Sequence, residues 1–281
     1  MSTLVPPLFA GLVDDASLLP PGIIGFAEAR AAHTKHRGSW YSGLIGALLV
    51  PASLANPDLT LTGLTVGVIN DTAIGHLPAV VAKLRAAGAE VGRVEAAVAR
   101  RGEDPQPGLV ALEALAAEAP DLDVYAEIPL SWGLLAGLDT VTAQRARGLR
   151  IAPKFRVGGL AAELFPTPVE LAAVICACRD RDLPFKLAAG LRHALRHTDP
   201  ETGFTHHGFL NVLVATVAAS DGAEVTDVAE ALAATHPVPL VEPARARRDE
   251  PRPLWAGFGT ANILEPLTEL IRLGLINGGY E

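Results

Sequence analysis

Cysteine is scarce in this chain. Its 281 residues include only Cys176 and Cys178, which stand two positions apart in a stretch of helical character. Residues at this spacing point to different faces of a helix. The pair therefore predicts neither a disulfide framework nor a zinc site, and we expect both to be small core or surface side chains.

The chain also lacks a basic excess and any long apolar run. With 31 acidic and 23 basic residues, its formal charge is −8, which argues against nucleic acid or an anionic membrane as partner. Apolar stretches such as "FLNVLVATVAA" fall short of the ~20 residues that a membrane span needs. The start, "MSTLVPPLFAG", has no basic segment followed by an apolar one, so we expect no secretory signal and a cytoplasmic location.

Short β-rich runs alternate with helical stretches along the chain, a pattern typical of parallel βαβ units. Eight strands with intervening helices predict a (β/α)8 TIM barrel over residues 1–281 as a single domain, because closure leaves no exposed sheet edge. The predicted strands are "LFAGLVDDA", "GALLVPAS", "LTVGVIND", "EVGRVEAAV", "DVYAEIP", "RIAPKFRVG", "LPFKLAAG" and "PLWAGFGT". The predicted helices are 25–42, 76–88, 108–118, 131–146, 168–181 and 263–273.

Residues 191–250, between the seventh and eighth strands, exceed the length of a usual crossover. We predict a helical insertion there, with helices over 206–219 and 225–235 and then an exposed connection. Two roles stay open for the segment: a decorative insertion, or a lid or specificity element at the barrel mouth.

Two lysines lie within apolar, strand-like runs: Lys154 in "RIAPKFRVGG" and Lys186 in "PFKLAAGLRHAL". Lysine is among the residues least often buried, so both positions need an explanation. Barrel active sites lie at the carboxyl ends of the strands, where adjacent strands would let the two amines approach. Two close ammoniums each favour losing a proton, and a neutral amine is what Schiff-base formation requires.

Other polar residues also fall near predicted strand ends. Asp14 and Asp15 predict either a carboxylate pair with one raised pKa or a hydrogen bond that ends the strand. Arg156 predicts either binding of a substrate carboxylate or phosphate, or a structural ion pair with Glu127 or Glu95. The further polar residues near strand ends are Ser53, Asn70, Asp71 and Arg93.

Histidines gather after the seventh strand. His193 and His197, four apart, would share one face of a helix, and His206 and His207 follow. Such spacing can serve zinc, but no third ligand is evident, so helix capping or acid–base work by His193 or His206 is the stronger reading. The chain has no Gly-x-Gly-x-x-Gly and no Gly-x-Ser-x-Gly motif. We therefore predict no cofactor and no metal.

The two lysine motifs resemble those of deoxyribose-phosphate aldolase and related class I aldolases. That family has a sixth-strand Lys-x-x-x-Gly motif, matched by Lys154 to Gly158. It also has a seventh-strand Phe-Lys-x-Ala-x-Gly-Val-Arg motif, matched by "FKLAAGLR" at Phe185 to Arg192. Weaker similarities run through "VDDASLL", "VIND", "YAEIP" and "GFGTAN".

The resemblance implies roles for individual residues. Lys154 would form the Schiff base, and Lys186 would be the neighbouring ammonium that lowers its pKa. Gly190 and the "GFGT" turn, with Gly259 and Thr260, would approach a substrate phosphate through backbone N–H groups near the start of the last helix.

The sequence departs from the family at several places, including the long insertion over 191–250, which has no counterpart in the simplest members. The fourth-strand aspartate that relays protons is replaced by Gly92 or Arg93, and the paired serines of the last turn by Ala261 and Asn262. The candidate catalytic residues are then Lys154, Lys186, Glu95, Glu127 and Asp14. The candidate substrate-binding residues are Arg156, Asn70, Gly158, Gly190, Arg192, Gly259, Thr260, His193 and His206.

Three functions stay open. The first is a lysine-dependent aldolase or related lyase acting on a small carbonyl compound, with or without a phosphate. The second is a non-imine isomerase or lyase in which Lys154, Arg156 and Lys186 bind an anionic substrate. The third is a catalytically silent barrel that binds a ligand or a protein. A homo-oligomer is compatible with each.

Overall fold

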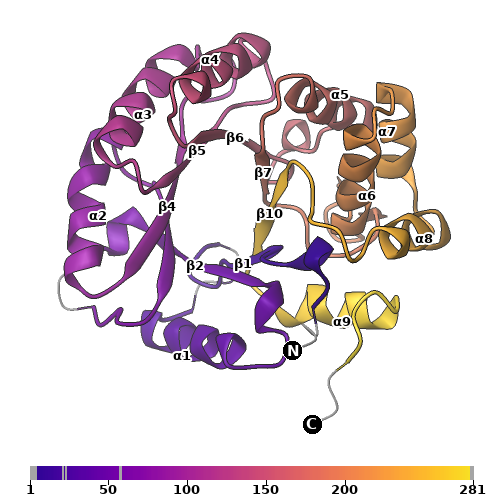
Figure 1. Ribbon diagram of the computed structural model, residues 1–281, viewed down its shortest axis with the longest axis horizontal. Coiled ribbons are helices and arrows are strands. Elements are labelled where there is room, and N and C mark those ends of the chain that lie inside the picture. The colour runs from indigo at the N-terminus through magenta and orange to yellow at the C-terminus, as the bar shows by residue number, and fades with distance from the viewer. Residues whose placement is uncertain (1–4, 21, 23, 57–58, 279–281) are drawn as a thin grey trace. The chain divides into compact units, whose positions relative to one another are not determined.

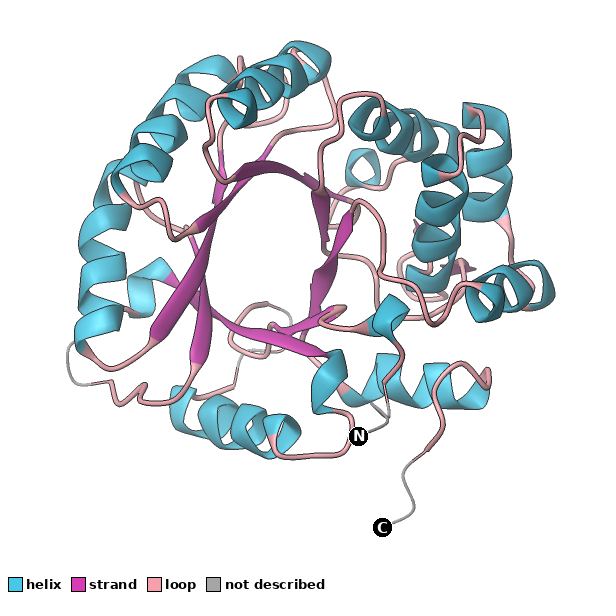
Figure 2. Ribbon diagram, in the orientation of Figure 1, coloured by secondary structure: helices cyan, strands magenta, loops and turns pink. Residues whose placement is uncertain are grey.

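The computed structural model describes residues 5–20, 22, 24–56 and 59–278, and it confirms the predicted barrel. Eight parallel strands close in the order β1–β10–β7–β6–β5–β4–β3–β2, and they are the magenta arrows of Figure 2. The strands are β1 (Val13–Asp15), β2 (Ile45–Pro51), β3 (Thr65–Ile69), β4 (Glu90–Ala97), β5 (Asp123–Glu127), β6 (Ile151–Arg156), β7 (Phe185–Ala188) and β10 (Trp255–Thr260).

The chain divides into two compact units. The first comprises Met1–Asp14, Lys35–Gly46 and Arg156–Glu281, and the second comprises Asp15–Thr34 and Ala47–Phe155. In the second unit, α2, α3 and α4 follow one another along strands β3 to β5 (Figure 1). The helices of this unit are α2 (Leu77–Ala86), α3 (Gln106–Glu118) and α4 (Leu134–Ala146), together with most of α1 (Phe26–Arg37).

The first unit holds β7, β10 and the segment between them. That segment contains the short antiparallel pair β8 (His197–Thr198) and β9 (Thr205–His206), and then α6 (Phe209–Ser220), α7 (Val225–Ala233) and α8 (Val238–Ala246). Helix α5 (Pro168–Arg179) precedes β7, and α9 (Leu264–Arg272) follows β10. Helix α5 begins at a capping box, in which Thr167 and Glu170 each satisfy the other's backbone N–H.

Helix α6 shows why this segment packs as it does. Its sequence "FLNVLVATVAAS" is apolar on almost every side, and Phe209 to Val217 are all buried. A helix of this kind has to be covered all round. Helices α5, α7 and α8 pack against it, and Figure 1 shows α5 in rose and α7 and α8 in orange.

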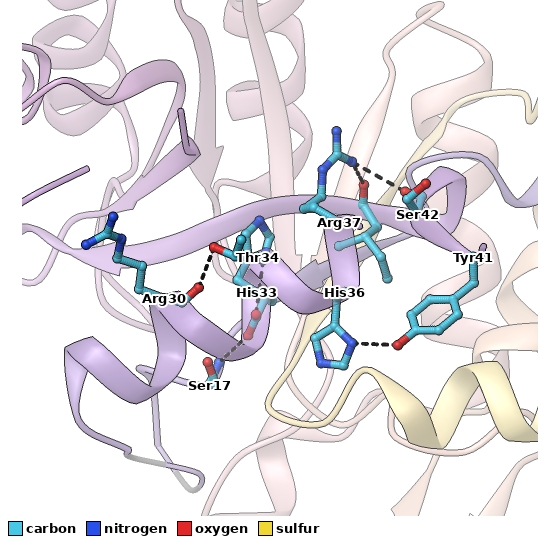
Figure 3. Close-up of polar contacts among 10 residues, drawn as sticks. Ser17, Arg30, His33, Thr34, His36, Arg37, Tyr41 and Ser42 are labelled. Atoms are coloured by element: carbon cyan, nitrogen blue, oxygen red, sulfur yellow. Dashed lines mark hydrogen bonds and ion pairs between the residues drawn. The ribbon is translucent and has the colours of Figure 1, made fainter. Parts of the chain in front are cut away.

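Several predicted boundaries are wrong. The first strand was expected over 8–16, but a 3-10 helix occupies Pro7–Phe9 and Gly11 has φ 58°, so β1 begins only at Val13. The first helix was expected to reach residue 42, but it ends at Arg37 before Gly38. There the Arg37 guanidinium donates to the carbonyls of Ser42 and Ile45 (Figure 3).

Two expectations for residues 191–250 are also wrong. The connection after residue 235 was expected to be irregular, but it forms α8, even with Pro243 inside the helix. His193 and His197 were expected to share one face of a helix, but residues 191–196 form irregular structure that leads into β8. The chain turns there because Ala189 and Gly190 both have positive φ, 61° and 75°.

No helix within the described part of the chain combines the length and the apolar character needed to cross a membrane.

Candidate active site

Lys154 is a buried cation held between two carboxylates. Its Nζ lies 2.8 Å from Glu127 Oε2 and 3.0 Å from Glu95 Oε2. The three side chains come from successive strands β6, β5 and β4. Glu127 stands directly opposite Lys154 in the register, and Glu95 lies two residues before the position opposite Glu127. Because strand side chains alternate, all three project from the same face of these strands.

The carboxylates of this cluster differ in exposure. The side chain of Glu95 is 2% exposed and that of Glu127 is 15% exposed, while that of Lys154 is 6% exposed. Glu95 is also fixed by its backbone, because its carbonyl accepts the Asn70 N–H at 2.8 Å. Glu127 is therefore the member of the cluster with the most access to solvent.

The pKa of Lys154 is raised. Burial acts to lower it, but the negative charges of Glu95 and Glu127 and their hydrogen bonds together outweigh burial. The amine is therefore protonated at neutral pH. The expected depression of this pKa by a second ammonium is wrong for the resting protein, because the carboxylates decide the protonation state.

Lys186 belongs to a second buried ion pair. Its Nζ lies 2.5 Å from Asp14 Oδ2, and the two side chains are 1% and 3% exposed. The pair joins β7 to β1, with β10 between them in the barrel order. Gly46 on β2 leaves room for the carboxylate: a Cβ there would lie 2.0 Å from Asp14 Oδ1.

The distribution of lysine is a signal in the sequence itself. The chain has four lysines, of which Lys35 and Lys83 are exposed and Lys154 and Lys186 are buried. Each buried lysine has carboxylate partners of its own. The predicted catalytic residues thus include the contacts of Lys154 with Glu95 and Glu127 in the second unit and the Lys186–Asp14 ion pair in the first.

Asp15, next to Asp14, has a different environment. Its Oδ2 lies 3.1 Å from Nδ1 of the buried His33, and its Oδ1 accepts the Ser17 backbone N–H at 3.1 Å (Figure 3). Burial acts to raise the pKa of Asp15, but these hydrogen bonds outweigh it and lower the pKa. The expected carboxylate pair is therefore absent, and Asp15 follows the alternative prediction of a hydrogen bond that ends the strand.

Asn70, a predicted substrate-binding residue, shapes the turn after β3. Its side-chain amide donates to the Thr72 carbonyl at 3.0 Å, and its Oδ1 accepts the Thr72 hydroxyl at 3.2 Å. Beside it, Asp71 accepts the Ser53 backbone N–H at 2.8 Å. These contacts hold the loops after β2 and β3.

Gly158 and Gly190 are needed for a close approach of two loops. A Cβ on Gly158 would lie 2.8 Å from the Gly190 Cα, and one on Gly190 would lie 2.7 Å from the Val157 carbonyl oxygen. The glycines of the two lysine motifs therefore bring the ends of β6 and β7 together, which is a structural reason for their presence.

The remaining predicted residues lie in several places. Arg156 is exposed at the end of β6. The Arg192 guanidinium lies 3.4 Å from the Glu265 carboxylate on α9. The His193 Nδ1 lies 2.8 Å from the Glu269 carboxylate on the same helix. Gly259 and Thr260 end β10, where the Thr260 hydroxyl accepts the Asn262 N–H at 3.3 Å.

His206 belongs to an aromatic cluster rather than to a helix. Its ring stacks on that of His197, with the ring centroids 5.2 Å apart, and meets the Phe165 ring edge to face, with centroids 4.8 Å apart. The rings of His193 and His197 also pack edge to face, with centroids 4.5 Å apart. The His206 Nδ1 lies 3.3 Å from the Gly190 carbonyl oxygen, which it reaches as a donor. His193 and His197 are thus neighbours, as their spacing suggested, but through a turn and a hairpin.

Sequence reasoning missed Arg196 and Asn211, and it named His207 only as one of the clustered histidines. The His207 ring is 1% exposed, and its Nε2–H donates to the Pro166 carbonyl at 2.8 Å. Burial lowers the pKa of His207 to about 4, so the ring is neutral at pH 7. Its Nδ1 then accepts from the Arg196 guanidinium at 3.4 Å. The fully buried Asn211 accepts the Arg196 backbone N–H at 2.8 Å.

Within the residues that the structure describes, no three histidine, cysteine, aspartate or glutamate side chains are placed to hold a metal ion. Both cysteines are buried in α5, and burial raises the pKa of each thiol. Comparison with models of known protein families, with curated proteins and with solved structures finds no match.

Proposed function

We propose that this protein is a lysine-dependent aldolase or related carbon–carbon lyase that acts on a small carbonyl compound through a Schiff base on Lys154. The observation that carries the proposal is the buried Lys154 ammonium between the carboxylates of Glu95 and Glu127. The nucleophile, a proton acceptor and a second negative charge are thereby in direct contact, as amine addition to a carbonyl requires.

The proton balance can be met within this cluster. The Lys154 ammonium gives one proton to Glu127, 2.8 Å away, and the neutral amine attacks the carbonyl carbon. The carbinolamine then loses water as Glu127 returns a proton to the leaving hydroxyl. The product is an iminium cation at the position of the former ammonium, with both carboxylates ionised again.

The raised pKa of Lys154 fits this chemistry. The carboxylates stabilise positive charge at Nζ, and the iminium carries positive charge at the same atom. The same two groups therefore stabilise the intermediate that withdraws electrons from the bond to be cleaved. The same carboxylates raise the free energy needed to form the neutral amine. The contact with Glu127 allows the amine to lose its proton directly to that carboxylate, without release of a proton to solvent.

The Lys186–Asp14 pair disfavours the anion-binding alternative. A cluster that binds an anionic substrate needs cations whose charge is available, whereas both buried lysines are ion-paired with carboxylates. In our proposal Lys186 has a fixed ammonium, held by Asp14, and is not the nucleophile.

Reductive trapping tests the proposal. The protein is incubated separately with acetaldehyde, pyruvate and hydroxyacetone in the presence of cyanoborohydride, and modified lysines are located by peptide mass spectrometry. We expect rapid modification of Lys154 with at least one probe. The exposed Lys35 and Lys83 report the background alkylation in the same sample.

Lys154→Arg is the matched variant, because it retains the charge and cannot form an imine. It should abolish the rapid phase and leave the labelling of Lys35 and Lys83 unchanged. If Lys154 in the wild-type protein is labelled by none of the probes above the rate of these surface lysines, the imine mechanism is wrong.

A further inference from the structure

Arg196 is a partly buried cation whose guanidinium is hydrogen-bonded, within the described part of the chain, to a neutral group. Its guanidinium has one hydrogen-bond partner among the described residues, the Nδ1 of His207 at 3.4 Å. His207 is neutral because burial holds its pKa at about 4 and because its other nitrogen donates to Pro166. No carboxylate of the described chain pairs with Arg196.

Arginines elsewhere in the same unit differ from it. Arg247 is 33% exposed and is paired with both Asp221 at 2.7 Å and Glu250 at 2.5 Å. Arg192 and Arg179 also have carboxylate partners. A partly desolvated cation without a counter-charge costs free energy, and burial accordingly lowers the pKa of Arg196.

The surroundings of Arg196 hold it in place. Its backbone N–H donates to Oδ1 of Asn211, whose amide in turn donates to the carbonyls of Ala231 and Ala234 at 2.8 and 2.7 Å. In the hairpin, His197 pairs with His206, so the preceding residue Arg196 lies opposite the following residue His207. The guanidinium thus starts from a fixed backbone and keeps four of its five N–H donors for a ligand.

We propose that Arg196, oriented by His207 and Asn211, binds an oxyanion, a phosphate or a carboxylate group. The planar fork of arginine suits bidentate binding of either group. The bound anion supplies the counter-charge that the polypeptide does not. The neutral state of His207 matters, because it accepts one N–H without neutralising the cation.

Calorimetric titration with inorganic phosphate and with acetate tests this site in the full-length protein. We expect wild type to bind at least one of them, and Arg196→Met to weaken that binding at least about tenfold, the loss expected for a charge-assisted hydrogen bond. Arg247→Met is the matched control, because Arg247 is an arginine of the same unit that already has carboxylate partners, and this variant should bind as wild type does.

Arg196→Lys keeps the charge and serves as a second variant in case the methionine variant does not fold. It should also bind more weakly, because it lacks the planar fork. A wild-type protein that binds neither anion overturns the proposal, and so do equal affinities for wild type and both Arg196 variants.

The anion has two sources, a free ion or the phosphate of a phosphorylated small molecule. Titration with glycerol 3-phosphate beside inorganic phosphate separates them. Tighter binding of glycerol 3-phosphate that Arg196→Met removes assigns the site to an organic phosphate, and equal affinities for the two assign it to a free anion. Neither titration depends on Lys154, so failure of the imine mechanism leaves both interpretable.

Discussion

The two buried lysines of this protein are held in unequal environments. Lys154 contacts two carboxylates, one of which, Glu127, is 15% exposed. Lys186 forms its ion pair with Asp14, and both side chains of that pair are at most 3% exposed. In the first arrangement Glu127 can accept a proton from Nζ while Glu95 stays ionised beside it. The Lys186–Asp14 pair is shielded from solvent, as is typical of a structural ion pair.

The comparison teaches that burial alone does not identify a reactive lysine. What distinguishes the two sites is the exposure of the carboxylate in contact with the amine, 15% for Glu127 and 3% for Asp14. Proton transfer needs an acceptor that contacts the amine and can exchange its proton. We therefore expect Lys154 variants to lose chemistry and Lys186 variants to lose stability.

The largest effect on stability is expected at the Lys186 pair. Lys186→Met removes the ammonium and leaves the buried Asp14 without it, which should lower the free energy of unfolding by about 3–5 kcal/mol. Urea denaturation measures this loss. The double variant Asp14→Asn/Lys186→Met should recover a large part of it, because no buried charge of the pair is then left alone.

A Lys186→Met protein as stable as wild type would contradict this assignment. So would a double variant that is less stable than the single one, because the two side chains would then not act as a pair.

The next effect concerns the space around Asp14. Gly46→Ala places a methyl group 2.0 Å from the present position of Asp14 Oδ1, so the carboxylate has to move away from Lys186. We expect a loss of about 1–3 kcal/mol in urea denaturation.

Gly92→Ala on β4 is its matched control. No heavy atom lies within 4 Å of the added Cβ there, so stability should change by no more than about 0.5 kcal/mol. Equal losses in the two variants would mean that the Asp14 contact does not restrict Gly46.

The smallest effect is a pH dependence at the Lys154 site. The pKa of Lys154 is raised in the folded protein, so its stabilising contribution is fully present below the ordinary value of 10.5 and is lost as pH rises through the folded pKa. Glu95→Gln removes one of the charges that raise this pKa. This variant should have a free energy of unfolding about 1 kcal/mol lower than wild type near neutral pH. The difference in free energy of unfolding between the two proteins should become smaller above pH 10.5.

Urea denaturation from pH 7 to 11 checks this behaviour, with Glu163→Gln, an exposed glutamate, as control. A difference between Glu95→Gln and wild type that widens above pH 10.5 would have the wrong sign for a raised Lys154 pKa.

Much of the fold could be predicted from the sequence, because strand and helix periodicities are local. The eight barrel strands and the helix over 168–181 were found in this way, and Thr167, Pro168 and Glu170 mark the start of α5. The helix α8 was missed because Pro237 and Pro243 read as an exposed connection. The hairpin that brings His197 opposite His206 was missed because its pairing is only two residues long.

The sequence predicted which residues belong to the candidate site, but it did not predict which of their side chains contact one another. Lysine in an apolar strand signals a special environment and identified Lys154 and Lys186. Glu95, Glu127 and Asp14 were identified as polar residues near the ends of predicted strands. The contacts of Lys154 with Glu95 and Glu127, and of Lys186 with Asp14, could not be predicted, because a single sequence does not give the register between strands that sets which side chains meet. Arg196 was missed because a charged residue between histidines has no periodic signature.

The sequence by itself determined the barrel and the two apolar runs that each contain one lysine, because alternation and hydrophobic burial act along the chain. Only the tertiary structure decided the charge state of Lys154, because that depends on Glu95 and Glu127 from two other strands. The same reason applies to Asp14 and Asp15. They are neighbours in sequence, but they point to opposite faces of β1 and so have different partners, Lys186 and His33.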